Sequence, residues 1–211
     1  MNKLITEISI TSARTEDVDA VADVLGAAFV DDPVFTWCIP DRDRRTVVLP
    51  AFFGLVTRSL LAHHHVQIAG SHQAVALWVP PATAPNGDDS AEFEHALDGV
   101  LGDAGERAFE VMSLLEAVHL GDPHWYLWFL GTAPADQGTG LGSGLLRHML
   151  ARCDRDGVPA YLEATSVANR RLYERHGFVV VDEVTVPGGP TLWAMWRPGA
   201  QVRQVVGASG R

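Results

Sequence analysis

The segment 124–146 constrains this chain more than any other part of its sequence. It begins with an apolar, aromatic run, turns at Pro134 and continues through a loop in which every second residue from 138 to 144 is glycine. A helix-spaced apolar pattern follows. Backbone N–H groups gathered in such a loop, with a helix N-terminus behind them, form a binding site for phosphate oxygens. The sequence therefore predicts a strand, a phosphate-binding loop and a helix, in that order.

Two common phosphate-binding loops do not fit this segment. A Walker A loop ends in Gly-Lys-Ser or Gly-Lys-Thr, and no lysine lies between Pro134 and Leu150. A dinucleotide-binding loop needs G-x-G-x-x-G, but Ser143 or Leu145 fills the third glycine position, depending on the starting glycine. Glu163 lies at a suitable sequence distance for a ribose contact. A dinucleotide or S-adenosylmethionine site thus has one supporting residue and lacks a required glycine.

Periodicity and turn residues divide the chain into alternating strands and helices. Strands are expected at 5–11, 66–69, 74–79, 159–165, 178–186 and 191–197, and in the run that starts at 125. Helices are expected at 15–31, 47–62, 93–101, 109–119 and 169–176, and after the glycine loop as far as Asp156. Residues 34–37 show no period, residues 41–45 form a charged connector, and Pro50 is acceptable only near a helix start. The order predicts an α/β fold in which helices cover both faces of a mixed sheet, with 125–165 as a right-handed parallel crossover.

Length and charge limit the classes of function. A chain of 211 residues can bury one substantial core. We expect a single domain over 1–197, followed by a flexible tail at 198–211. A net charge of −10 disfavours a nucleic-acid partner held by a broad basic face. No signal segment and no membrane-length apolar run occur, so we expect no membrane partner and a cytoplasmic protein.

No pattern in the sequence indicates a metal site. Cys38 and Cys153 lie far apart and are expected to be buried apolar residues. Adjacent side chains of the run His63-His64-His65 would point to alternating faces of a strand, so they cannot converge on one ion without other ligands. We therefore expect no metal cofactor.

A third phosphate-loop pattern, Q/R-x-x-G-x-G/A, is present as Gln137-Gly138-Thr139-Gly140-Leu141-Gly142. Downstream, Asn169 is followed by Tyr173-Glu174-Arg175-His176-Gly177-Phe178. In these motifs the chain resembles the GNAT-type N-acetyltransferase superfamily. Segments at 27–33, 76–80, 162–165 and 186–195 look like those of puromycin N-acetyltransferase and its relatives. The resemblance implies the GNAT fold, with a mixed, mostly antiparallel central sheet and helices on both faces, and it implies acetyl-CoA as co-substrate.

The resemblance also implies roles for individual residues. Main-chain N–H groups of the loop would hold the acetyl-CoA pyrophosphate, where side chains would block its approach. Main-chain groups near the strand end, and the Asn169 side chain, would bond the pantetheine arm. The implied cofactor-binding residues are Leu130, Thr132, Gln137, Gly138, Thr139, Gly140, Gly142, Ser143, Asn169 and Tyr173. Thr139 departs from the pattern, because many relatives carry a basic residue there that can contact phosphate through its charge.

Acetyl transfer from a thioester to an amine needs a neutral amine, a polarised carbonyl and a proton for the departing thiolate. Tyr173 lies one helical turn after Asn169 and is the candidate general acid. Glu163, on the strand after the loop, is the best candidate base, directly or through water. Other candidate bases are His119, His124, Asp31 and Asp32. An acceptor amine with a low pKa would need no dedicated base.

The sequence thus predicts an acetyl-CoA-dependent N-acetyltransferase that acts on a primary amine of a small molecule by direct attack in a ternary complex. The aromatic segment beside Asp31 and Asp32 can line an amine-binding site. Two alternatives stay open. One is a protein N-terminal acetyltransferase, and the other is an acyl-CoA-binding sensor or regulatory module without efficient turnover. The sequence is compatible with a monomer or a homodimer.

Overall fold

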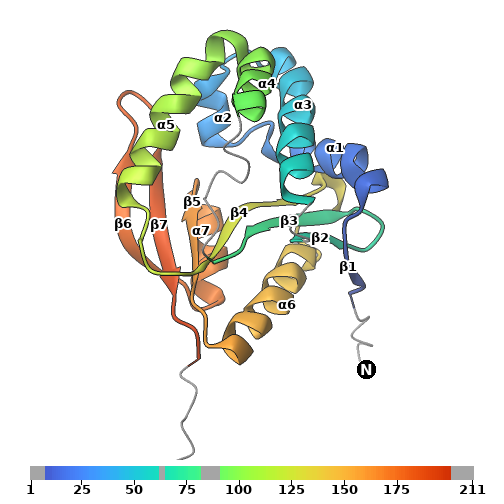
Figure 1. The fold of residues 1–211 in the computed structure, drawn as a ribbon, viewed down its shortest axis with the longest axis vertical. Coiled ribbons are helices and arrows are strands. Elements are labelled where there is room, and N and C mark those ends of the chain that lie inside the picture. The colour runs from blue at the N-terminus through green and yellow to red at the C-terminus, as the bar shows by residue number, and fades with distance from the viewer. Residues whose placement is uncertain (1–7, 62–64, 82–90, 201–211) are drawn as a thin grey trace, which may run out of the picture.

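One mixed sheet organises the chain. In the computed structural model, which describes residues 8–61, 65–81 and 91–200, a seven-stranded sheet has the strand order β1-β2-β3-β4-β5-β7-β6 (Figure 1). The strands are β1 (Ile10–Ser12), β2 (Val66–Ala69), β3 (Ala74–Val79), β4 (Trp125–Thr132), β5 (Ala160–Ala164), β6 (Val179–Thr185) and β7 (Thr191–Arg197). Neighbours are antiparallel except β4 and β5, which are parallel. The predicted mixed, mostly antiparallel sheet is confirmed.

Helices cover both faces of this sheet. They are α1 (Val18–Phe29), α2 (Pro33–Cys38), α3 (Arg42–Leu61), α4 (Ala91–Leu101), α5 (Gly105–Val118), α6 (Leu141–Asp156) and α7 (Val167–Arg175). Short 3-10 turns are η1 (Thr15–Asp17), η2 (Gly102–Ala104) and η3 (Pro134–Asp136). Side chains of α6 and α7 pack on one face of the sheet, and those of α1 and α3 pack on the other (Figure 1).

The central strand β3 shows how the two cores are separated. Its side chains alternate between the faces, as they must in a strand. Ala74, Ala76 and Trp78 lie in the core beneath α6, while the three valine and leucine side chains between and after them lie in the core beneath α1 and α3. All six positions are buried, which explains why this strand has no polar face.

The segment between α1 and α3 differs from the expectation. Residues 34–37, which show no period in the sequence, belong to α2. Asp32 is the N-cap of this helix and Pro33 is its first residue. An aspartate followed by proline is a helix-start signal. In so short a helix the start signal is more informative than periodicity.

The start of α3 also corrects a prediction, because the helix begins at Arg42 and the residues after Asp41 are not a connector. The Asp41 carboxylate accepts hydrogen bonds from the N–H groups of Asp43 (2.9 Å) and Arg44 (3.1 Å), which starts the helix early. Pro50 consequently lies inside the helix and not near its start. A Cβ on Gly26 of α1 would stand 2.9 Å from the Pro50 Cγ, so the close α1–α3 packing favours glycine there.

Some predictions fall on residues outside the described ranges, namely the loop at 82–90, His63, His64 and the tail beyond residue 200. Within the described ranges, no group of His, Cys, Asp and Glu side chains is arranged to hold a metal ion. No helix in this part of the chain has the length and apolar character needed to cross a membrane. Both cysteines are buried free thiols.

Candidate active site

β4 and β5 separate soon after they meet. Their parallel pairing covers only Trp125 with Ala160 and Tyr126 with Tyr161. In contrast, β4 stays paired with β3 as far as Thr132. Beyond Tyr126, the edge of β4 that faces β5 therefore has no partner strand in the described ranges. The sheet is open along this edge.

One hydrogen bond fixes the direction of the main-chain groups on the open edge. The N–H of Ala133 donates to the carbonyl oxygen of Gln73 (2.8 Å), so these opposite residues form a hydrogen-bonded pair. Bonded and non-bonded pairs alternate along antiparallel strands. Leu130 and Thr132 occupy the non-bonded positions of this register. Their N–H and C=O groups consequently turn away from β3 and toward the open edge.

The glycine loop leads from this edge to the N-terminus of α6. Gly140 is the N-cap of α6 with φ of 93°, and no side chain caps the helix. Gly138 also has a positive φ, of 76°. Such backbone conformations favour glycine, and a Cβ on either residue would meet no atom within 4 Å. Among the residues that the structure describes, no side chain therefore caps the first N–H groups of α6, which lie next to open space.

Contacts hold the loop against the end of β4. Gln73 Nε2 donates to Asp136 Oδ1 (2.7 Å), and the Thr139 hydroxyl donates to the Asp136 carbonyl oxygen (2.6 Å). A Cβ on Gly142 would lie 3.5 Å from Thr132 Oγ1, so the first turn of α6 packs directly against β4. The loop and the open edge therefore form one continuous surface.

The remaining polar side chains of the loop contact protein groups. Gln137 Nε2 donates to the Thr132 carbonyl oxygen at 3.4 Å. The Ser143 hydroxyl lies 3.2 Å from Nε2 of His176. Burial, followed by the charge of Arg147, lowers the pKa of His176. What the loop offers to an anion is mainly its main-chain N–H groups.

Asn169 and Tyr173 lie one turn apart on α7, as their spacing predicts. Ser166 caps this helix by accepting the Asn169 N–H at 3.2 Å. Tyr173 is buried in the core that α6 and α7 share. Burial, and then the charge of Asp32, raises the pKa of Tyr173. The phenol therefore keeps its proton at neutral pH.

Asp32 reaches the end of β5 from the α1–α2 segment. Its Oδ1 accepts the N–H groups of Val34 (2.9 Å) and Phe35 (3.4 Å), and its Oδ2 accepts the hydroxyl of Thr165 (2.5 Å). Asp32 is only 9% exposed, and burial raises its pKa. The link to Thr165 spans 133 residues of sequence, so residue spacing gave no sign of it.

Glu163 lies in a buried polar cluster with Tyr126 and two histidines. The Tyr126 hydroxyl donates to Glu163 Oε2 at 2.8 Å. The other oxygen, Oε1, is buried without a hydrogen-bond partner and lies 3.8 Å from His119 Nδ1. His119 Nε2 lies 3.1 Å from His124 Nε2, and His124 Nδ1 lies 2.6 Å from the Asp122 carbonyl oxygen. Three of the predicted candidate bases are thus brought together.

The Asp122 carbonyl determines where the protons sit when both imidazoles are neutral. A carbonyl only accepts, so His124 carries its proton on Nδ1 and accepts at Nε2. His119 then donates from Nε2, which leaves its Nδ1 without a proton. Burial lowers the pKa of His124 and so favours the neutral ring. His119 Nδ1 and Glu163 Oε1 consequently face each other as two acceptors, with room for one more proton.

Residues 74–178 match the Acetyltransferase (GNAT) family. A Corynebacterium glutamicum structure described as histone acetyltransferase HPA2 and related acetyltransferase is 31% identical, with a TM-score of 0.72, covering 92% of this chain and 98% of that one. An uncharacterized N-acetyltransferase of Schizosaccharomyces pombe is 27% identical over 79% of this chain and 72% of its own length. Arylalkylamine N-acetyltransferase 2 of Aedes aegypti shares the fold at 16% identity and a TM-score of 0.60, covering 92% of this chain and 99% of its own. The chain therefore belongs to the GNAT family of acetyltransferases, which use acetyl-CoA as the acetyl donor.

Proposed function

We propose that this chain acetylates a primary amine of a small molecule by direct attack in a ternary complex with acetyl-CoA. The observation that carries the proposal is the open edge of β4 beside the uncapped N-terminus of α6. The helix N-terminus supplies donors for pyrophosphate oxygens, and the strand edge supplies donors and acceptors for the amide groups of pantetheine.

In the proposed donor site, the N–H groups of residues 138–143 bind the pyrophosphate. The main chains of Leu130 and Thr132 bond the pantetheine arm, because their polar groups turn toward the open edge. The Asn169 side chain bonds the same arm from α7. The thioester carbonyl then lies near the Leu130 N–H, which polarises it as an oxyanion-hole donor does.

Tyr173 acts as the general acid in this proposal. The amine nitrogen forms a bond to the acetyl carbon, the carbon–sulfur bond breaks, and the thiolate takes the phenolic proton. Burial raises the pKa of Tyr173, so the phenol carries its proton when the sulfur departs. The tyrosinate then recovers a proton from solvent before the next turnover.

Glu163 and His119 together act as the base. The proton that the amine loses goes, directly or through a water molecule, to the space between Glu163 Oε1 and His119 Nδ1. One proton placed there converts two opposed acceptors into a charge-assisted hydrogen bond. The pair therefore has a place for the proton that the amine loses.

Release of free CoA thiol, with mass detection of the acetylated product, tests this function. The full chain is incubated with acetyl-CoA and a panel of primary amines that includes puromycin, with a short peptide as a comparison. We expect equal amounts of thiol and N-acetylated small amine. Stabilisation of the fold by acetyl-CoA without turnover on any amine would instead identify a sensor, and preferential acetylation of the peptide N-terminus would identify a protein acetyltransferase.

A further inference from the structure

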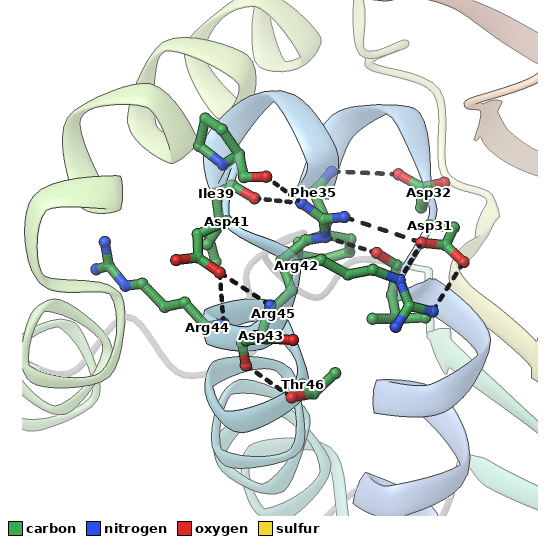
Figure 2. Close-up of polar contacts among 12 residues, drawn as sticks. Asp31, Asp32, Phe35, Ile39, Asp41, Arg42, Asp43, Arg44, Arg45 and Thr46 are labelled. Atoms are coloured by element: carbon green, nitrogen blue, oxygen red, sulfur yellow. Dashed lines mark hydrogen bonds and ion pairs between the residues drawn. The ribbon is translucent and has the colours of Figure 1, made fainter.

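Two adjacent carboxylates at the start of α2 have opposite surroundings. The Asp31 side chain is 68% exposed. Its Oδ1 forms ion pairs with Arg42 at 3.2 Å and with Arg45 at 3.8 Å (Figure 2). Asp32 is buried and points toward α2 and the end of β5. No Lys, Arg or His side chain in the described part of the chain forms an ion pair with it, although buried carboxylates are normally paired with a cation.

Asp32 has capacity for one more donor. Its partners are the N–H groups of Val34 and Phe35 on Oδ1 and the Thr165 hydroxyl on Oδ2, all of them neutral. An ionised carboxylate offers about four lone-pair positions. The unused position is on Oδ2, the oxygen that faces Thr165. Thr165 follows the end of β5, so this position lies beside the end of that strand.

Arg45 holds the helix that carries this carboxylate. Its guanidinium donates to the carbonyl oxygens of Val30 (2.6 Å), Ile39 (2.6 Å) and Pro40 (2.9 Å), which flank α2 on both sides (Figure 2). The Arg45 side chain is itself buried. Because both ends of α2 are fixed, Asp32 keeps its position beside β5 without a cation to hold it.

Four half-buried phenylalanines form a cluster that includes Phe35 of α2, and we call them the aromatic wall: Phe29, Phe35, Phe52 and Phe129. Neighbouring ring centroids in this group are 5.5–6.0 Å apart. Phe35 gives its N–H to Asp32, and Phe129 belongs to the stretch of β4 that has no partner on the β5 side. The wall therefore connects the helix that Asp32 caps with the strand that carries the open edge.

We propose that Asp32 binds the ammonium nitrogen of the incoming acceptor, which loses one proton to solvent before the neutral amine attacks, and that the aromatic wall binds the carbon skeleton of the acceptor. The acceptor is then an amine with a single positive charge on an aromatic or bulky apolar skeleton. This inference rests on the proposed function for the reaction and adds the class of acceptor. One unused carboxylate position matches one ammonium group, and the phenyl rings pack against an apolar skeleton. A polyamine would place a second ammonium against phenyl rings with no carboxylate to pair with it.

Substitution Asp32→Asn tests the inference, with Asp31→Asn as the matched control. Asparagine keeps the N-cap of α2, so the substitution removes the charge and retains the fold. The dissociation constant of phenethylamine for the CoA-bound protein is measured by calorimetry, and KM is measured for the amine and for acetyl-CoA. For Asp32→Asn we expect the dissociation constant and the KM of phenethylamine each to rise by about 30-fold or more, as for a buried charge pair that loses one partner. Asp31→Asn should leave them within about twofold, since it removes only an exposed pair, and KM for acetyl-CoA should not change in either variant.

A second comparison tests the acceptor class. Phenethylamine should bind the unsubstituted protein at least about tenfold more tightly than putrescine, because only one ammonium finds a counter-ion. The inference would be overturned if the two variants, Asp32→Asn and Asp31→Asn, bound phenethylamine with equal affinity. It would also be overturned if the unsubstituted protein bound putrescine more tightly than phenethylamine, or did not bind phenethylamine. Binding of phenethylamine through Asp32 without release of thiol from acetyl-CoA would refute the proposed function and leave the binding site standing.

Discussion

His119 Nδ1 faces Glu163 Oε1 at 3.8 Å inside a buried cluster, and the surrounding hydrogen bonds leave both atoms as acceptors. One residue follows the end of α5 and the other lies on β5, so only the folded chain brings them together. Two opposed acceptors have a place for one proton between them. We propose that this place takes the proton of the amine, and the proposal underlies the first prediction.

Substitution Glu163→Gln should separate catalysis from stability. The glutamine oxygen can still accept the Tyr126 hydroxyl, while its NH₂ group can donate to His119 Nδ1 and fill the vacant position. We therefore expect Tm to stay equal or rise, kcat to fall by about a hundredfold, and KM for acetyl-CoA to stay unchanged. Steady-state kinetics and thermal melts check this. An unchanged kcat would show that the amine proton leaves by another route.

Substitution Tyr173→Phe should lower turnover and leave the donor site intact. Phenylalanine keeps the ring packed in the core and removes only the proton that the departing thiolate needs. We expect kcat to fall by more than about tenfold while the dissociation constant of acetyl-CoA changes little. Retention of full turnover would remove Tyr173 from the mechanism.

Gly138 and Gly188 offer a matched pair for the phosphate loop. Both have positive φ, of 76° and 67°, and a Cβ on either would meet no atom within 4 Å. An alanine at each position should therefore cost similar backbone strain and lower Tm by similar amounts. Only Gly138→Ala should weaken acetyl-CoA binding, by about tenfold, because its methyl group occupies the space proposed for phosphate. Equal acetyl-CoA affinities in calorimetric titrations would place the pyrophosphate elsewhere.

Arg45 should matter for stability far more than Arg42. Substitution Arg45→Met leaves the carbonyl oxygens of Val30, Ile39 and Pro40 without their buried donor, at a cost of about 3 kcal/mol or more. Arg42→Met removes an exposed pair with Asp31, where solvent screens the charges and the cost is much smaller. Denaturant unfolding of both variants measures the two costs. Similar free energies of unfolding would show that Arg45 does not fix α2.

The raised pKa of Asp32 predicts a pH-dependent stability. Burial lifts this pKa above its usual 3.8 in the folded chain, so between the two values the folded state binds more protons than the unfolded state. The free energy of unfolding then falls as pH rises through that window, and the full loss of stability is reached by neutral pH. Asp32→Asn removes the ionisable group and with it this loss of stability. The Tm of Asp32→Asn minus the Tm of the unsubstituted protein should therefore be larger at neutral pH than at about pH 4. A smaller difference at neutral pH would contradict the effect of burial on Asp32.

The sequence predicted the elements around the proposed donor site well because its signals are local. The glycine loop, the strand before it and the helix after it are contiguous, and Asn169 and Tyr173 are one helical turn apart. These features depend on backbone geometry over a few residues. The predicted layout of β4, α6 and α7 therefore agrees with the structure.

The acceptor side depends on contacts between distant segments, which the sequence did not reveal. Asp32 was one carboxylate among several candidates, and its bond to Thr165 exists only because α2 packs near the end of β5. The pairing of His119 with Glu163 has the same origin. The two errors at α2 and α3 arose because neither Asp32 nor Asp41 was interpreted as a helix cap, although both are caps.

A product assay with the full chain, acetyl-CoA and phenethylamine tests the proposed activity most directly. We predict that N-acetylphenethylamine and free CoA thiol form in equal amounts, and that Tyr173→Phe slows the formation of both. Formation of thiol without acetylated amine would show hydrolysis. Tight acetyl-CoA binding with neither product, on this amine and on the rest of the panel, would contradict the central claim that the chain is a small-molecule N-acetyltransferase.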